Sequence, residues 1–169
     1  FDMYEDSHGT LWIASMGSGL WKYDAKKDLY KKYLSDGKDA HSLSSNSVSA
    51  IMEDHKGQIW LSTDRGGTCK YDVRNDGFIR YSLSEGFPDD VAYKILEDTV
   101  GNLWMGTNQG LVQFNPESGN MRVFTVENGL LGNQFNYQSA VKGHDGKFYF
   151  GSVNGLVSFN PYVKEKLDK

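Results

Sequence analysis

Residues 53–64 contain side chains that could carry out acid–base chemistry, among them Glu53, Asp54, His55, Thr63 and Asp64. A carboxylate pair beside an imidazole can exchange protons with a substrate, and clustered oxygen ligands can bind a cation. A catalytic centre needs such a group only once, whereas a structural motif of a repeat protein must recur. The number of copies therefore decides between the two interpretations.

The pattern occurs four times at a nearly constant interval. Turn glycines lie at Gly9, Gly57, Gly101 and Gly146, which are 48, 44 and 45 residues apart, and an aromatic residue follows three positions later at Trp12, Trp60, Trp104 and Tyr149. A fixed period of this length indicates a repeat architecture. The aspartates Asp6, Asp54 and Asp98 are therefore predicted to cap a hairpin turn through hydrogen bonds to the backbone. We expect no catalytic role and no metal site there, because the turn lacks the alternating oxygen ligands of a calcium loop.

Each copy is predicted to form four short strands separated by turns. In the second copy these strands fall within residues 48–54, 58–63, 68–72 and 78–81. Val48, Ala50 and Met52 would share one face of the first strand, with Ile51 on the other. Short strands joined by tight turns form one antiparallel sheet per repeat. No segment shows the 3.6-residue apolar period of a helix, so the helix content should be near zero.

Sheets of this kind bury both faces by stacking radially around an axis, which predicts an all-β fold, a β-propeller fragment of about four blades. The four repeats would cover residues 1–34, 46–82, 91–125 and 134–161. Repeated positions then acquire roles. Small residues would lie where blades approach (Ala14, Ser62, Gly106, Gly151), hydroxyls would satisfy the backbone at the end of the second strand (Ser15, Thr63, Thr107, Ser152), and aromatic residues would fill the space between blades (Tyr23, Tyr71, Phe114, Phe159).

The ends of the array raise the question of closure. The first repeat begins at its first strand and the fourth has no evident fourth strand, so each end blade would expose a face. The chain could close as a tight four-bladed ring. Alternatively, two copies could form a homodimer through their open blade ends.

Composition excludes several kinds of partner. The net charge is −4 and no basic run is present, so we expect no nucleic acid, which requires clustered Lys and Arg. The apolar runs are too short to cross a bilayer, so no direct membrane contact is expected. Cys69 is the single cysteine and takes a position held by apolar residues in other copies, which predicts a packed thiol. His41 and His55 are predicted at the surface, and no cofactor is implied.

Loops between the second and third strands, and connections between blades, should meet on one face around the axis. Function commonly lies in loops that a rigid scaffold positions. The first kind of loop supplies polar candidates for binding an oligosaccharide or another small molecule, namely Asp64, Arg65, Asn108, Gln109 and Asn154. Phe87 or Tyr93 would supply an aromatic platform. These residues differ between copies, so the scaffold does not dictate them.

An enzyme is the alternative to a binding module. The spacing Asp-x-x-Gly-x-x-Trp is similar to the Asp-box turn of sialidases, which is itself structural. A glycosidase needs two carboxylates at a defined separation, and the acidic residues expected on the loop face show no such pairing (Asp64, Glu85, Asp89, Asp90, Glu127). A sialidase would need several arginines there, and Arg65 is the one suitably placed. We expect no catalysis by this chain. A protein-interaction propeller of the kelch or WD type stays open as an alternative.

The repeated motifs resemble the two-component regulator propeller repeat. Its pattern runs approximately G-L-P-x-N-x-V, I-x-E-D, G-x-L-W-[IF]-G-T and G-L-x-x-[YF]-[DN]. The first element corresponds here to Leu43, Asn46 and Val48, and the third to the tryptophan segments around Trp60 and Trp104. Residues 1 to about 161 follow the pattern, although the fourth copy lacks I-x-E-D.

This resemblance implies a function. Such repeats form the extracytoplasmic, periplasmic sensor region of bacterial membrane histidine kinases, often hybrid ones, and many sense breakdown products of polysaccharides. The chain would be the C-terminal blades of one propeller, and residues 162–169 would be a tail leading to a following domain. Its partners would be the oligosaccharide and the rest of the receptor chain, where the kinase chemistry would lie.

Overall fold

The computed structural model describes residues 1–162, which form fifteen strands in four antiparallel sheets, here termed blades 1 to 4. Blade 1 contains β1 (Asp2–Glu5), β2 (Thr10–Ala14), β3 (Leu20–Asp24) and β4 (Leu29–Tyr33), and blade 2 contains β5 (Val48–Glu53), β6 (Ile59–Thr63), β7 (Thr68–Asp72) and β8 (Gly77–Tyr81). Blade 3 contains β9 (Ala92–Glu97), β10 (Leu103–Thr107), β11 (Leu111–Phe114) and β12 (Met121–Phe124). Blade 4 contains β13 (Phe135–Lys142), β14 (Phe148–Ser152) and β15 (Gly155–Phe159).

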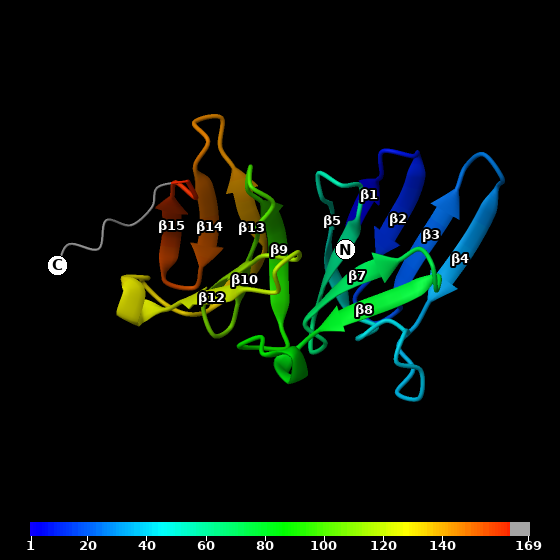
Figure 1. Cartoon of the computed structure of the whole chain (residues 1–169), viewed down its shortest axis with the longest axis horizontal. Helices are drawn as coiled ribbons and strands as arrows, with labels where there is room; N and C mark the ends of the chain where they lie inside the picture. The colour runs from blue at the N-terminus through cyan, green and yellow to red at the C-terminus, as the bar shows by residue number, and fades with distance from the viewer. Residues whose placement is uncertain (163–169) are drawn as a thin grey trace.

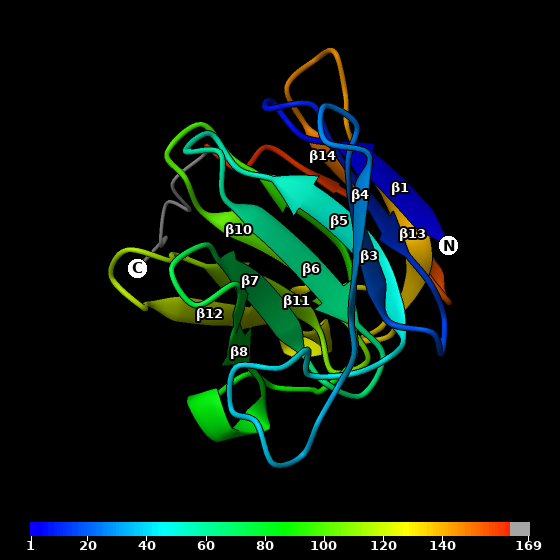
Figure 2. The same ribbon diagram turned by 90° about the vertical axis from the view of Figure 1, so that its right-hand side faces the viewer.

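The all-β propeller prediction is confirmed. The described helical structure is two short 3₁₀ segments in the connections between blades, η1 (Leu83–Glu85) and η2 (Val126–Asn128). Figure 1 shows the blades in an open arc, with blade 4 at the left end and blade 1 at the right. Figure 2 looks at the blade 1 end, and the sheets lie one behind another. No helix in the described part of the chain has the length and apolar character to cross a bilayer. The expected tail lies outside the described residues, apart from Tyr162.

A carboxylate links the hairpin turn of each of the first three blades to its tryptophan. In blade 2, Asp54 Oδ2 accepts from the indole Nε1 of Trp60 at 2.8 Å, while Oδ1 accepts from the backbone of Lys56 and Gln58 at 2.9 Å each. Asp6 with Trp12 and Asp98 with Trp104 repeat this arrangement at 2.8 and 2.9 Å. The capping role predicted for these aspartates is confirmed.

In blade 4 the hairpin turn is also capped by a carboxylate, but the carboxylate comes from a different sequence position. Gly143 occupies the place of the aspartate, and a side chain there would meet Asp145 Oδ1 at 2.5 Å. Asp145 fills that space, accepting from the Tyr149 hydroxyl at 2.8 Å and from the Lys147 backbone at 3.1 Å. The glycine therefore makes room for a carboxylate that comes from two residues further along.

The tryptophan of each blade packs on the next blade in the chain. Trp12 meets Tyr71 with ring centres 4.9 Å apart, Trp60 meets Phe114 at 6.2 Å, and Trp104 meets Phe159 at 4.8 Å. We name the tryptophan side of a blade its outgoing face and the opposite side its incoming face. Three buried apolar clusters follow, one between each pair of successive blades. The predicted packing role of the third-strand aromatic residues is confirmed at Tyr71, Phe114 and Phe159.

A glutamate joins neighbouring hairpin turns across two of these interfaces. Glu53 of blade 2 accepts from the backbone of Ser7 at 2.8 Å and from its hydroxyl at 2.5 Å. Glu97 of blade 3 likewise accepts from the His55 backbone at 2.8 Å and pairs with the His55 ring at 2.5 Å. The two residues of the Glu-Asp pair thus have different roles, since the aspartate closes its own turn and the glutamate binds the preceding blade.

Two details of strand packing depart from or extend the sequence pattern. Val48 was predicted on the face of Ala50 and Met52, but a β-bulge between Val48 and Ala50 places it with Ile51 in the cluster between blades 1 and 2. An extra residue in a strand reverses the alternation beyond it. The predicted hydroxyl role is confirmed, because the second-strand hydroxyls donate to a carbonyl across the hairpin at 2.8–3.0 Å (Ser15, Thr63, Thr107, Ser152).

The two end blades each leave one face uncovered within the described residues. On blade 1 this is the incoming face, which carries Met3 (68% exposed), Tyr30 (63%) and the half-buried Tyr23. On blade 4 it is the outgoing face, which carries Val141, Tyr149 and Leu156. The arc is therefore open and does not form the tight four-bladed ring considered from the sequence.

We predict that Asp54→Asn destabilises the fold by about 2 kcal/mol, because its new amide would face the Trp60 indole N–H with a second donor and leave that buried group unsatisfied. Urea unfolding followed by tryptophan fluorescence measures the change. The exposed substitution Glu127→Gln is the control and should stay within about 0.5 kcal/mol of the parent. Equal stability of the two variants would contradict the capping role.

A second prediction concerns acid stability and Asp76, which joins blades 1 and 2. Its carboxylate accepts from Tyr33 at 2.6 Å and Tyr71 at 2.5 Å and pairs with Lys31. Burial raises the pKa of Asp76, but these three donors outweigh it and lower the pKa to about 2. Because the unfolded pKa is near ~3.9, the stabilisation is complete above that pH and is lost as the pH falls toward ~2.

The matched variant is Asp76→Asn, which removes the charge at every pH. We expect it to be less stable than the parent at pH ~6, and the difference should shrink steadily between pH ~5 and ~2. Urea unfolding across that range measures both proteins. A difference that stays constant with pH would contradict the role given to the carboxylate.

Candidate functional site

The repeat symmetry is broken near the propeller axis, where residues of three blades meet. Tyr93 at the start of β9 donates its hydroxyl to Asn108 Oδ1 at 2.6 Å, and its ring meets Tyr137 edge-on with centres 4.7 Å apart. Gln138 donates from Nε2 to the Ser49 carbonyl of blade 2 at 2.6 Å. We name Asp64, Tyr93, Asn108, Tyr137 and Gln138 the axial cluster.

Strand β13 is deformed where it contributes to this cluster. Its pairing with β14 shifts register between Phe135 and Ala140, and Gln138 has φ of +53°. Arg65, beside Asp64 in the β6–β7 loop, has φ of +63°. Left-handed backbone at non-glycine residues is uncommon and costs free energy, and it often occurs at functional sites. Here the bulge directs Tyr137 and Gln138 of blade 4 toward the axis.

The axial cluster combines an accessible aromatic ring with polar groups. Tyr137 is 38% exposed, whereas Tyr93 beneath it is 5% exposed. The Asp64 side chain is 24% exposed. Burial raises the pKa of both tyrosines, and the negative charge of Asp64 raises each pKa further, so both phenols stay protonated at neutral pH. The cluster therefore offers hydroxyl donors, amide groups, one carboxylate and a ring.

The structure brings three of the seven predicted binding residues together: Asp64, Tyr93 and Asn108. Phe87 was predicted as a possible aromatic platform and this is wrong, because it is 4% exposed and packs against Tyr81 and Phe114 in the core between blades 2 and 3. The position of Phe87 in the connection between blades 2 and 3 predicts an exposed side chain, but the ring is buried in the cluster between these blades.

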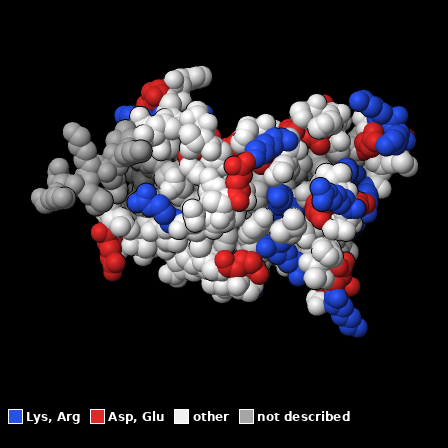
Figure 3. Space-filling model, viewed as in Figure 1, with Lys and Arg blue, Asp and Glu red and all other residues white. Residues whose placement is uncertain are grey.

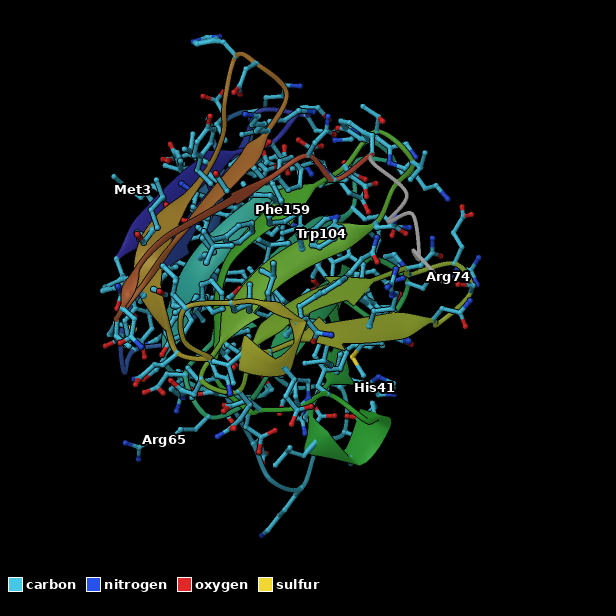
Figure 4. The ribbon with its side chains drawn as sticks, turned by 90° about the vertical axis from the view of Figure 1, so that its left-hand side faces the viewer. Met3, His41, Arg65, Arg74, Trp104 and Phe159 are labelled. Carbon is cyan, nitrogen blue, oxygen red and sulfur yellow. The ribbon has the colours of Figure 1, made fainter. Side chains whose placement is uncertain are left out.

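The other predicted residues are not members of the axial cluster, although Arg65 borders it next to Asp64. Arg65 is 87% exposed and projects into solvent in Figure 4, with its Nε 4.0 Å from Asp64 Oδ2. Gln109 is exposed beside Asn108. Asn154 donates to the Leu131 carbonyl at 2.9 Å, so its amide supports a loop of its own blade.

Tyr137 and Gln138 were not identified from the sequence. They lie where the fourth copy departs from the I-x-E-D element, and that departure was the available signal. Ser49, which receives the Gln138 bond, is buried and also donates to the Ala92 carbonyl at 3.0 Å. The positions at which the fourth copy departs from the repeat pattern therefore point to Tyr137 and Gln138.

Several of the carboxylates expected on the loop face are engaged by the backbone. Asp89 accepts from Val91 at 2.6 Å, Asp90 from Leu83 at 3.0 Å and Glu85 from Ser82 at 2.8 Å. No group of three potential metal ligands occurs within residues 1–162. In the view of Figure 3, acidic and basic side chains are interspersed without a broad patch of either sign.

The chain is similar in sequence and in fold to known proteins of two-component systems. Residues 42–65 and 86–109 match the two component regulator propeller family. The chain is 30% identical, with a TM-score of 0.82, to the extracellular domain of the hybrid two component system BT3049 from B. thetaiotaomicron, covering 95% of this chain and 21% of that one. It is also 39% identical over 69 residues to histidine kinase P4 of Formosa agariphila, covering 41% of this chain and 5% of that kinase.

A more distant likeness extends to an enzyme. Virginiamycin B lyase from Staphylococcus aureus is 14% identical with a TM-score of 0.68, over 94% of this chain and 54% of the lyase, which shows the fold alone. The matched repeats include the Asp54–Trp60 unit and the Asp98–Trp104 unit, both described above. The chain is therefore a β-propeller segment, and two stretches of it match the two component regulator propeller repeat.

Proposed function

We propose that this chain is part of the periplasmic sensor region of a membrane-bound two-component histidine kinase, and that its axial cluster binds an oligosaccharide. The observation that carries the sensor assignment is the 30% identity over 95% of the chain to an extracellular domain of a hybrid two component system. The chain spans about a fifth of that domain, so the activity of a whole receptor belongs to the proposal.

The chemistry of the axial cluster supports a sugar as ligand. A sugar ring presents C–H groups that pack on an aromatic face and hydroxyls that need both donors and acceptors. Tyr137 supplies an exposed ring, and Asp64 and Asn108 supply oxygen acceptors. Tyr93 and Gln138 are held by hydrogen bonds to other blades or loops, so the ring beside them is already positioned.

Binding without catalysis is the function the geometry favours. Hydrolysis of a glycosidic bond needs two carboxylates facing one bond, and the axial cluster contains one, Asp64. Asp89 lies near enough for its charge to raise the pKa of Tyr93, but its carboxylate accepts from the Val91 backbone. The lyase among the similar structures shares the fold at 14% identity, which carries no activity across.

A protein-interaction scaffold is the second candidate function. The observation that favours it is the apolar character of the two uncovered blade faces, with Met3 68% and Leu156 61% exposed. Within a longer receptor chain these faces would meet other blades, whereas in isolation they would support the homodimer considered from the sequence. The sensor proposal does not depend on which of these covers them.

We predict that Tyr137→Ala and Asn108→Ala each weaken binding of a neutral oligosaccharide about tenfold or more, because each removes a contact worth about 1.4 kcal/mol. Isothermal titration calorimetry with a panel of purified neutral oligosaccharides measures the affinity. Release of new reducing ends from any of them would instead support the enzyme alternative.

Arg74→Ala is the matched control, since Arg74 is exposed and lies far from Arg65 in Figure 4. It should leave the affinity unchanged. The axial assignment would be wrong if Tyr137→Ala and Asn108→Ala bound as tightly as the parent, or if no member of the panel bound to the parent.

A further inference from the structure

Corresponding lysines on two successive blades have different environments. Lys22 lies opposite Trp12 in blade 1, and its Nζ donates to the Tyr71 hydroxyl of blade 2 at 3.0 Å. It also lies over the Tyr71 ring, 4.7 Å from the centre. The Tyr71 hydroxyl thus accepts a hydrogen bond from the Lys22 ammonium group, and this contact links blades 1 and 2 at this point.

At the next interface the partner hydroxyl is missing. Lys70 lies opposite Trp60 in blade 2, and the residue that corresponds to Tyr71 in blade 3 is Phe114. Lys70 Nζ lies 5.7 Å from the Trp60 ring centre and makes no hydrogen bond or ion pair within residues 1–162. A lysine ammonium has three donors, and those of Lys70 have no acceptor in the described part of the chain.

A groove opens at this place on the face opposite the axial cluster loops. It runs between the hairpin turns of blades 2 and 3 and is lined by Gln58, Lys70, Val100, Pro116 and Glu117 among others. The Gln58 side-chain amide also makes no hydrogen bond within the described residues. Val100 is 71% exposed and, with Pro116, gives the groove an apolar wall.

The carboxylates around the groove are already matched. Asp54 is 8% exposed and accepts from the Trp60 indole and two backbone groups. Glu97 holds His55, and Glu117 pairs with Lys56 at the exposed rim. An exposed pair such as Lys56–Glu117 contributes little stability and exchanges readily with solvent or a ligand. Lys70 is therefore the charge in this groove that has no counter-ion among residues 1–162.

We propose that this groove binds an acidic sugar, a uronate, independently of the axial cluster. The carboxylate of the uronate pairs with Lys70 Nζ, and its hydroxyls bond to the Gln58 amide and to the Lys56–Glu117 pair at the rim. The C–H face of the sugar ring packs on Val100 and Pro116. A neutral sugar lacks the charged group that Lys70 requires and binds here more weakly.

The test uses D-glucuronate as probe and D-glucose as the neutral comparison, titrated in low-salt buffer and followed by isothermal titration calorimetry. We expect glucuronate to bind the parent at least about tenfold more tightly than glucose, since only glucuronate can form a charge-assisted hydrogen bond with Lys70. Added salt should weaken the binding, because the groove is open to solvent.

Two variants remove the site in different ways. Lys70→Met deletes the charge but keeps an unbranched side chain over Trp60. Phe114→Tyr keeps the charge and adds a hydroxyl that can accept a hydrogen bond from Lys70, as the Tyr71 hydroxyl does from Lys22 in the preceding interface. Each should lower glucuronate affinity about tenfold or more. Near-ultraviolet circular dichroism checks that the cores are intact.

Lys22→Met is the matched control and should bind glucuronate like the parent, as should Tyr137→Ala, which removes the axial ring. A loss with Tyr137→Ala alone would move uronate binding to the axial cluster and overturn the groove assignment. The proposal also fails if glucuronate does not bind, if glucose binds equally well, or if Lys70→Met retains the parent affinity.

Discussion

The fold depends on burying a tryptophan between sheets while its indole N–H stays hydrogen-bonded. Trp60 is fully buried, and a donor left unsatisfied there would cost free energy that packing alone could not easily recover. The carboxylate of Asp54 resolves this, and the same carboxylate closes the hairpin turn. One side chain thus couples the local turn to the interface with the next blade, which explains why the acidic residue, the glycine and the aromatic residue recur together.

Much of this architecture could be predicted from the sequence because it repeats. The spacing of Trp12, Trp60, Trp104 and Tyr149 predicts the number of blades, and the recurring hydroxyls and aspartates predict their own hydrogen bonds. Other features have no counterpart in a linear pattern. One is the bulge that moves Val48 to the opposite face of its strand. Another is the capping carboxylate of blade 4, which comes from Asp145 because Gly143 leaves space for it. Both depend on the space available in three dimensions.

The candidate site was predicted less well, for a related reason. Loop position placed Asp64, Tyr93 and Asn108 on one face, where the axial cluster lies, but it could not distinguish the buried Phe87 from the exposed Tyr137. Exposure in a connection depends on which side chains the neighbouring blade leaves room for. Residues that break the repeat are informative in both sites described here. Gln138 lies in the distorted part of strand β13, and Phe114 lacks the hydroxyl with which its counterpart Tyr71 accepts a hydrogen bond from Lys22.

The uncovered faces of blades 1 and 4 have a consequence for how such proteins vary. The outgoing and incoming sides of a blade are different and complementary, so the array has a direction, and every junction uses one kind of contact whatever its place in the series. Whole repeats can therefore be gained or lost without inventing a new type of junction. A different kind of contact lies at the centre, where Gln138 of blade 4 donates to the Ser49 carbonyl of blade 2. Contacts between successive blades and contacts across the centre are therefore made by different side chains.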